Sequence, residues 1–232
     1  KTKNVQRKTK TTEMEWPSLK PKSHLQINRM KDDDLFTIPS YFTVSESKAF
    51  IAAAESIGFV HQGSLGPAKG EAFRDNDRIS VNDPVLCRNI WEAGLDQAFS
   101  GFKISGKVAV GLNPNIRFYR YTSGQQFGCH IDESVDLGEG KRTYYTLLIY
   151  LSGSPGKAEM SVKSNGTEAS EGGLISGGET VFYGRRNAVV AEVSPTEGLA
   201  LLHIHGNKCM LHEARPVIKG IKYVLRSDVV FA

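Results

Sequence analysis

Three residues of this 232-residue chain combine types and spacing that suit a metal ion. His130 and Asp132 are separated by one residue, so in an extended segment both side chains project to one face and Ile131 points away. His212 lies much later in the chain, and several strands of a barrel can bring it back to the first two residues. Two imidazoles and one carboxylate make the facial triad of non-haem Fe(II) sites, which leaves adjacent coordination positions open. We predict that these three residues bind Fe(II).

A lysine after the second histidine extends this chemistry. Lys222 follows Pro216 and Gly220, which mark a turn, and it opens the strand-like run KYVLRSDVVF. From a strand beside the metal, its ammonium group could bind the distal carboxylate of 2-oxoglutarate, whose keto-acid end chelates iron. Such charge-assisted hydrogen bonds are worth about 1.5–3 kcal/mol. The alternative is a strand-end lysine that extends into solvent.

Two other histidines compete for the same role. His203 and His205 also have strand spacing and lie near His212, as a cupin-like metal module would require. However, the other face of their strand is apolar, and no matching turn and lysine follow them. We therefore predict that His212 is the ligand. Cys129 and Cys209 are interpreted as packing residues, because nothing nearby in the sequence lowers the pKa of a thiol.

Strand patterns fill the second half of the chain. After residue 107, β-branched and aromatic runs are separated by Gly and Pro, which is typical of an all-β region. The runs are NIRFYRY, TYYTLLIYL, TVFYG, AVVAEV, GLALLHI and KYVLRSDVVF. Earlier, Leu35–Ile38 predicts a short strand, and Thr43 or Ser45 is placed to cap a helix that Gly58 ends. A second helix is predicted from Pro84 to about Phe99. Its inward-facing residues are predicted to be Val85, Ile90, Trp91 and Leu95.

We predict one domain behind a basic arm. Residues 1–31 contain nine Lys or Arg and two Asp or Glu, and they lack periodicity, so they are interpreted as a mostly irregular arm that a nucleic acid or an acidic protein could contact. Residues 32–232 form the domain, with a helical support region at 32–106 and the catalytic β region at 107–232. The Ser- and Gly-rich insert at about 153–177 is predicted to be a mobile loop.

Composition excludes several classes of protein. Hydrophobic residues at 40% and charged residues at 23% are ordinary for a globular domain and argue against a disordered or fibrous chain. No apolar run is long enough to span a membrane, although an upstream targeting or anchor segment stays open. Three cysteines without CxxC spacing favour a reducing compartment, cytoplasmic or nuclear, over a disulfide framework. Oligomeric state is not predicted.

Four segments, in order, resemble one known family. YTSGQQFGCHID, RTYYTLLIYLS, GGETVFY and HEARPVIKGIKYVLRSDVVF look like the catalytic domain of prolyl 4-hydroxylase-type, Fe(II)- and 2-oxoglutarate-dependent dioxygenases. AFRDNDRISVNDPVL resembles the support region of that family more loosely. The resemblance implies a mainly β fold with supporting helices, a double-stranded β-helix of the jelly-roll, cupin-like type. It also implies Fe(II) and 2-oxoglutarate as cofactors, with ascorbate to restore the iron.

The resemblance also suggests roles for single residues. It assigns Fe(II) to His130, Asp132 and His212 and the cosubstrate carboxylate to Lys222. It implies that two further cosubstrate contacts come from Tyr121 and Thr180. A substrate contact is implied for Arg142, which is otherwise an exposed strand-end charge. The chain departs from the family after GGET-x-F, where Tyr183-Gly184-Arg185-Arg186 replaces a frequent proline and puts a basic pair at the rim.

The implied reaction is hydroxylation of a protein prolyl residue, with release of succinate and CO2. Two alternatives stay open: an oxygenase that acts on a nucleic acid or a small molecule, and a non-catalytic metal-binding module. The presence of the triad together with Tyr121 and Lys222 argues against a non-catalytic module. The substrate itself is not predicted, because loops at the rim decide specificity.

Overall fold

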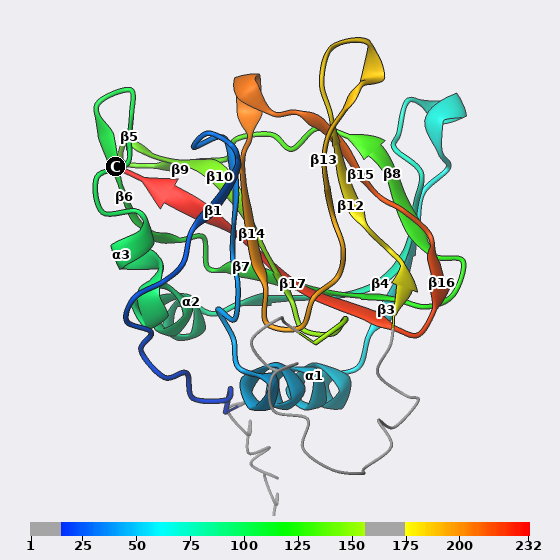
Figure 1. Ribbon diagram of the computed structural model, residues 1–232, viewed down its shortest axis with the longest axis horizontal. Helices are drawn as coiled ribbons and strands as arrows, with labels where there is room; N and C mark the ends of the chain where they lie inside the picture. The colour runs from blue at the N-terminus through cyan, green and yellow to red at the C-terminus, as the bar shows by residue number, and fades with distance from the viewer. Residues whose placement is uncertain (1–14, 156–174) are drawn as a thin grey trace, which may run out of the picture.

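Strands dominate the fold and helices cover one side of it (Figure 1). The computed structural model describes residues 15–155 and 175–232. Most of the predicted mobile insert and the first half of the predicted basic arm lie outside the described residues. The helices are α1 (Val44–Ile57), α2 (Pro84–Ile90) and α3 (Asp96–Ala98), with a π-helical turn at Trp91–Leu95 and 3-10 turns at Pro67–Lys69, Arg185–Asn187 and Gly206–Lys208. Within the described residues, no helix has both the length and the apolar character needed to cross a membrane.

One antiparallel sheet of 15 strands forms the body of the molecule. The strands are β1 (Asn28–Lys31), β2 (Leu35–Ile38), β3 (Val60–Gly63), β4 (Arg74–Asn82), β5 (Lys103–Ile104), β6 (Lys107–Leu112), β7 (Asn115–Tyr121), β8 (Gln126–His130), β9 (Asp136–Gly138), β10 (Lys141–Tyr150), β12 (Thr180–Tyr183), β13 (Val189–Val193), β14 (Ala200–Ile204), β15 (Leu211–Ala214) and β17 (Lys222–Phe231). A separate pair joins β11 (Ser176–Gly177) to β16 (Val217–Lys219). The path β1-β2-β14-β10-β17-β7-β4-β8-β15-β12-β13 curls so that its two parts face each other (Figure 1). This arrangement confirms the predicted jelly roll.

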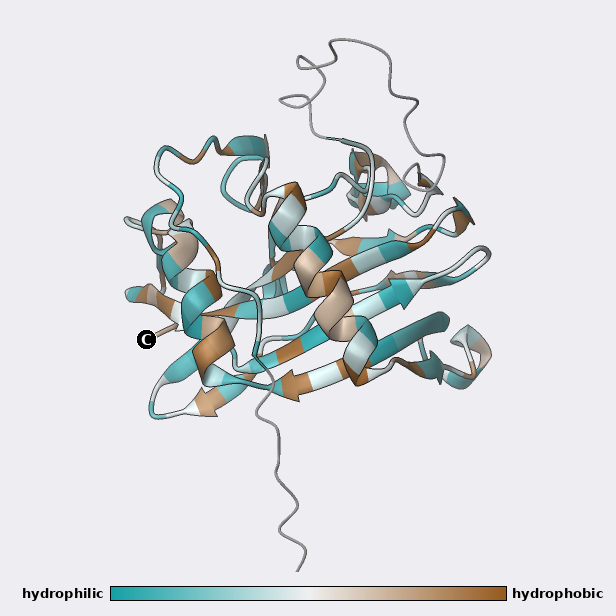
Figure 2. Ribbon diagram, turned by 90° about the horizontal axis from the view of Figure 1, so that it is seen from below, coloured by the Kyte–Doolittle hydropathy of each residue, from teal (hydrophilic) through white to brown (hydrophobic). Residues whose placement is uncertain are grey.

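The central strands bury both of their faces. On β17, Leu225 and Val229 belong to the core that also contains the helix residues, whereas Val224 belongs to the core inside the barrel. Figure 2 shows α1 and α2 lying across the outer side of these strands. Because successive strand residues point to opposite faces, Lys222 and Arg226 share the interior face with Val224. Polar groups on that face are therefore held inside an otherwise apolar barrel.

Helix α1 begins where the sequence predicted. Thr43 is the N-cap: its Oγ1 accepts a hydrogen bond from the backbone N–H of Glu46 at 3.2 Å, and the Glu46 carboxylate accepts one from the backbone N–H of Thr43 at 2.8 Å. This reciprocal capping box satisfies two backbone donors that the helix itself leaves free. Gly58 ends the helix with a φ of 92°, a conformation that favours glycine. Phe50 and Ala54 are fully buried against the sheet.

The second predicted helix is interrupted. It starts at Pro84 with Asp83 as N-cap, but after α2 it widens into the π-helical turn, where Gly94 has a φ of 144°. The expectation that Val85 faces inward is wrong, because its side chain is 55% exposed in the first turn. Ile90 and Leu95 are completely buried, as predicted. A single helical period cannot describe both sides of the interruption, since the extra residue in the π-turn rotates the buried face.

The described part of the predicted arm packs on the domain. The Trp16 ring stacks on Phe118 of β7, with ring centroids 5.1 Å apart, and its Nε1 donates a hydrogen bond to Asp83 at 2.9 Å. Lys22 forms an ion pair with Glu46 at 2.8 Å, and both side chains are largely buried. Residues 15–27 are irregular, and β1 follows them at the edge of the sheet. These contacts tie the arm to β7, to the first helix and to the start of the second helix.

Candidate active site

Sheet register brings the two predicted histidine ligands together. His212 on β15 and His130 on β8 are direct cross-strand partners, and their ring centroids lie 4.2 Å apart. Asp132 follows the end of β8, with its Oδ1 3.8 Å from His130 Nε2 and its Oδ2 3.6 Å from His212 Nε2. The potential ligand atoms of the three residues all lie within 4.8 Å of one another. Ile131 points outward and is 56% exposed, as the alternating pattern predicted.

Backbone carbonyls orient both imidazoles. His130 Nδ1 donates to the Gly128 carbonyl at 2.9 Å, and His212 Nδ1 donates to the Met210 carbonyl at 2.9 Å. A carbonyl oxygen only accepts, so each Nδ1 carries the proton and each Nε2 is the free ligand nitrogen. Burial lowers the pKa of His130 to about 4 and also lowers that of His212. Both rings are therefore neutral at neutral pH, which is the form that binds a metal.

Two residues hold the Asp132 carboxylate. Arg226 Nη2 lies 2.9 Å from Oδ1, and the Thr146 hydroxyl donates to Oδ2 at 2.8 Å. Burial alone would raise the pKa of Asp132, but the charge of Arg226 keeps that pKa well below its usual range. The carboxylate is thus ionised and fixed in orientation. Among the described residues, these partners give Asp132 the support that metal-binding carboxylates commonly have.

Lys222 lies completely inside the barrel. Its Nζ donates to the Gly178 carbonyl at 2.6 Å and lies 5.2 Å from the centre of the Tyr121 ring and 5.5 Å from that of Tyr150. Burial lowers the pKa of Lys222 to about 7. Its cross-strand partner on β7 is Tyr121, so the register of β17 and β7 fixes this pair. The ammonium group is therefore an interior cation and does not extend into solvent.

The other two predicted cosubstrate residues line the same space. The Tyr121 hydroxyl is 3.1 Å from Asn76 Nδ2, and burial raises the pKa of Tyr121, so the hydroxyl keeps its proton. The Thr180 hydroxyl is 2.6 Å from the Tyr150 hydroxyl, across the barrel from β12 to β10. An inner pocket thus runs from the predicted metal ligands to Lys222. Its remaining lining is Tyr119, Tyr121, Phe127, Leu148, Thr180, Glu213, Ala214, Val224 and Arg226.

A second space opens from the predicted metal ligands toward solvent. This outer cleft has a volume of about 470 Å³. The Arg74 guanidinium lies 4.2 Å from the centre of the Phe127 ring, which stacks on the His130 ring at 3.7 Å. Charged residues of both signs line the cleft: Glu71, Arg74, Arg117, Asp132, Glu133, Arg226 and Asp228. The inner pocket and the outer cleft share Phe127, His130, Asp132 and Arg226.

The competing histidines lie beside the triad and differ from each other. His205 is saturated, with Nδ1 3.0 Å from the Thr146 hydroxyl and Nε2 3.0 Å from the Thr143 hydroxyl. His203 Nε2 lies 3.6 Å from Asp132 Oδ2 and has no hydrogen-bond partner within the part of the chain that the structure describes. Arg142 is exposed at the start of β10 and lines an open cleft that adjoins the outer cleft at Ile131, Asp132 and Glu133. The substrate contact suggested for Arg142 stays a prediction.

Several site residues escaped the sequence analysis. Arg226 is four positions after Lys222 on the same strand, so the alternation of side chains could have placed both on the interior face. Thr146 and Asn76 carry no such signal, because ordinary strand residues have the same pattern. They reach the site only through the cross-strand pairing of β10 and β4 with their neighbours.

Comparisons with known proteins bear on this architecture. No family model and no curated protein matches the chain. Among solved structures, a viral collagen prolyl hydroxylase from Paramecium bursaria Chlorella virus-1, in complex with 2-oxoglutarate, is similar at 19% identity with a TM-score of 0.56, covering 86% of this chain and 96% of that one. A prolyl 4-hydroxylase from Pseudomonas putida is similar at 13% identity and a TM-score of 0.56, over 84% of this chain and 92% of that one.

A third similar structure carries a peptide. It is a prolyl hydroxylase from Trichoplax adhaerens in complex with a peptide fragment of the oxygen degradation domain of hypoxia-inducible factor, at 16% identity and a TM-score of 0.57, covering 85% of this chain and 84% of that one. The chain has the fold of the prolyl hydroxylases. This agrees with the resemblance of the sequence motifs, and at these identities the likeness concerns the fold alone.

Proposed function

We propose that the chain is an Fe(II)- and 2-oxoglutarate-dependent dioxygenase that hydroxylates a prolyl residue of a protein or peptide and releases succinate and CO2. The observation that carries the proposal is the inner pocket, in which a complete facial triad and a buried lysine line one continuous space. A metal ion alone would not require an interior cation. A dicarboxylate that binds the metal through one end requires a cation at its other end.

The donor set fits Fe(II). His130 and His212 present unprotonated Nε2 atoms toward an ionised carboxylate, at distances too long for hydrogen bonds. Three protein ligands leave coordination positions for a chelating cosubstrate and for dioxygen. When bound, iron with 2-oxoglutarate and dioxygen supplies the oxidation, in which one oxygen atom enters succinate and the other enters the substrate. The protein residues position these partners and exclude water.

Residues of the inner pocket fit 2-oxoglutarate. Lys222 would pair with the distal carboxylate, and the Tyr121 and Thr180 hydroxyls would donate hydrogen bonds to it. Leu148, Ala214 and other apolar side chains around this cation exclude water and strengthen its attraction to an anion. Gly178 has a φ of 74°, and a Cβ there would lie 3.2 Å from Lys222 Cδ. Glycine at this position therefore leaves room for the Lys222 side chain.

The outer cleft favours a polypeptide substrate over a nucleic acid. Its lining includes basic and acidic residues in similar number, whereas a surface that binds phosphates is predominantly basic. The peptide-bound neighbour is a prolyl hydroxylase. These points support a prolyl residue presented in a peptide.

The experiment measures succinate formation from 2-oxoglutarate with and without Fe(II), and then oxygen gain on candidate substrates by mass spectrometry. We expect turnover that depends on Fe(II), is prolonged by ascorbate, and is abolished in His130→Ala, Asp132→Ala and His212→Ala. His61→Ala is the matched control, because this histidine is exposed on β3. Turnover in His212→Ala with loss in His203→Ala would show that the second histidine was wrongly chosen. Oxygen gain on an oligonucleotide and not on proline-containing peptides would overturn the substrate class.

A further inference from the structure

One buried histidine has no role in the proposed iron centre. His203 is fully buried, and its Nε2 has no hydrogen-bond partner among the described residues. A buried polar atom left without a partner costs about 1–3 kcal/mol. The atom lies 3.6 Å from Asp132 Oδ2, and the ring packs edge-on against His212 with centroids 4.6 Å apart. Such an atom is placed to bind a ligand beside the Asp132 carboxylate and His212.

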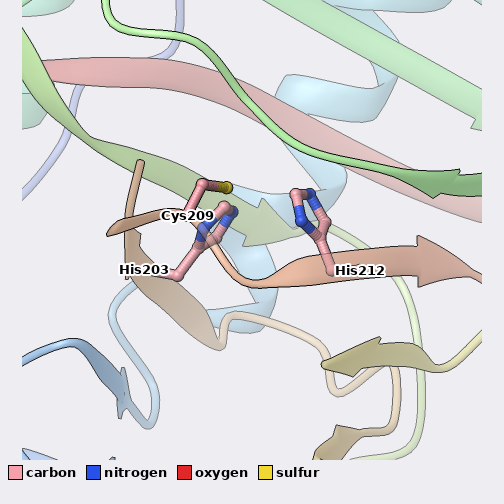
Figure 3. A group of neighbouring side chains, drawn as sticks. All are labelled: His203, Cys209 and His212. Atoms are coloured by element: carbon pink, nitrogen blue, oxygen red, sulfur yellow. The ribbon is translucent and has the colours of Figure 1, made fainter. Parts of the chain in front are cut away.

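A thiol completes the surroundings of this histidine. Figure 3 shows the side chains of His203, Cys209 and His212 around a common space, and their potential ligand atoms lie within 4.8 Å of one another. Cys209 Sγ accepts a hydrogen bond from the backbone N–H of Asp132 at 3.2 Å. The adjoining turn is also fixed, because Gly206 N–H donates to the Asp132 carbonyl at 2.9 Å. The sulfur is therefore held in place beside the triad.

We propose that His203, Cys209 and His212, with Asp132 as a fourth ligand, form a second metal site that takes a thiophilic divalent ion such as Zn²⁺ or Cd²⁺. Two imidazoles, one thiolate and one carboxylate are a tetrahedral donor set, and sulfur favours these ions over Fe(II). Binding displaces the thiol proton of Cys209 to solvent. Because four protein ligands saturate the ion, the site leaves no position for 2-oxoglutarate or dioxygen.

The two metal sites exclude each other. His212 has one free nitrogen, Nε2, since its Nδ1 donates to Met210, and both sites need that atom. Asp132 is also shared, with His130 3.8 Å from one of its oxygens and His203 3.6 Å from the other. The protein therefore binds Fe(II) on the His130 side or a thiophilic ion on the His203 side. Occupation of the second site blocks the first without touching Lys222.

The test titrates the full chain, free of metal, with Cd²⁺ and follows the ultraviolet charge-transfer band of a cadmium–thiolate bond. We expect the band in the wild type and in Cys129→Ser, the matched control, whose thiol is exposed and lies beside Glu213. Cys209→Ser should lack the band, and His203→Gln should weaken Cd²⁺ binding by roughly tenfold or more, about 1.4 kcal/mol or more. A band that persists in Cys209→Ser, or that disappears in Cys129→Ser, would overturn the site.

A second measurement does not depend on the folding of the cysteine variant. His130→Ala removes a ligand of the iron triad and none of the proposed second site, so it should lose Mn²⁺ binding and keep the Cd²⁺ band. In the wild type, Mn²⁺ and Cd²⁺ should compete, so that each chain binds one equivalent of either ion and not of both. Equal loss of both ions in His130→Ala, or simultaneous binding of one equivalent of each, would refute the inference. Absence of 2-oxoglutarate turnover would count against the proposed function and leave these results unaffected.

Discussion

The inner pocket and the outer cleft meet at the same proposed metal ligands, but their linings are opposite in character. The inner pocket holds its cation between aromatic rings, with Lys222 and Tyr121 both buried. The outer cleft is open, and charges of both signs lie along it. A closed site with one cation selects one small anion, whereas an open site of mixed charge accepts a flexible chain. The proposed cosubstrate and the proposed substrate would thus contact separate walls.

The contrast also separates two cations on the interior face of β17. Lys222 and Arg226 are four residues apart on its interior face, one in the inner pocket and the other between the two spaces. Arg226 is committed to Asp132, at 2.9 Å, and so serves the metal site. Among the described residues, the Lys222 ammonium group donates to the Gly178 carbonyl, which leaves its other donors for a ligand. The two interior cations on this strand therefore have different proposed roles: Arg226 orients Asp132, and Lys222 binds a ligand.

The largest difference between the two spaces should appear when the inner cation is removed. Lys222→Ala should keep Mn²⁺ binding and lose affinity for 2-oxoglutarate by roughly two orders of magnitude, if the carboxylate pair and its hydrogen bonds contribute about 3 kcal/mol. Lys222→Arg should retain more affinity than Lys222→Ala yet stay impaired, because the forked guanidinium is larger than the ammonium group it replaces. Titration of 2-oxoglutarate into the Mn²⁺-loaded proteins measures this.

Arg74→Ala is the matched control from the outer cleft, and it should leave the affinity for 2-oxoglutarate unchanged. Equal affinities in the wild type and Lys222→Ala would remove the cosubstrate assignment. Equal losses in Lys222→Ala and Arg74→Ala would show that the two spaces are not functionally separate.

The pH dependence of 2-oxoglutarate binding should also come from the inner pocket. Burial lowers the pKa of Lys222 to about 7, so the free protein loses this charge as pH rises above that value. The bound dicarboxylate favours the charged form, hence binding takes up a proton above pH 7. Affinity should fall by up to about tenfold per pH unit above 7 and level off below it.

Lys222→Arg provides the contrast, since arginine stays protonated throughout this range. Isothermal titration of the Mn²⁺-loaded proteins in buffers of different ionisation enthalpy would count the protons taken up. A pH profile in Lys222→Arg that matches the wild type would place the titrating group elsewhere.

The sequence predicted the parts of the site that depend on local spacing. His130 and Asp132 follow from the alternation of side chains in an extended segment, and Lys222 follows from the turn before its strand. The jelly roll and α1 also agree with the sequence patterns. The spacing of the site residues and the helix are determined by neighbours within a few residues, whereas the jelly roll was expected from the resemblance of whole motifs to a known family.

The parts that were missed depend on long-range pairing. The orphaned Nε2 of His203 arises because β14 pairs with β10 inside the barrel, and no local pattern reports which polar atoms stay unsatisfied there. Val85 was misplaced because the π-turn breaks the helical period that had been applied across it. Trp16 packs on Phe118 across more than a hundred residues of chain. Such contacts follow from the closed fold and have no local sequence signal.

The smallest expected effect concerns Thr180, and it asks whether the wall of the inner pocket contacts the cosubstrate at all. Thr180→Val is nearly isosteric and removes a hydroxyl that already bonds to Tyr150 at 2.6 Å. If the hydroxyl also binds 2-oxoglutarate, affinity should fall by about two- to tenfold, the value of one hydrogen bond of about 0.5–1.5 kcal/mol.

Tyr150→Phe is the control: it removes the hydrogen-bond partner of Thr180 and leaves Thr180 in place, so it should alter thermal stability with little effect on affinity for 2-oxoglutarate. The double variant completes a double-mutant cycle. Direct contact between Thr180 and 2-oxoglutarate is supported if the two losses of stability are not additive, while the loss of affinity occurs only where Thr180 is replaced. Unchanged affinity in Thr180→Val would reduce Thr180 to a support for Tyr150, and the cosubstrate would then depend on Lys222 and Tyr121 alone among the residues proposed to bind its carboxylate.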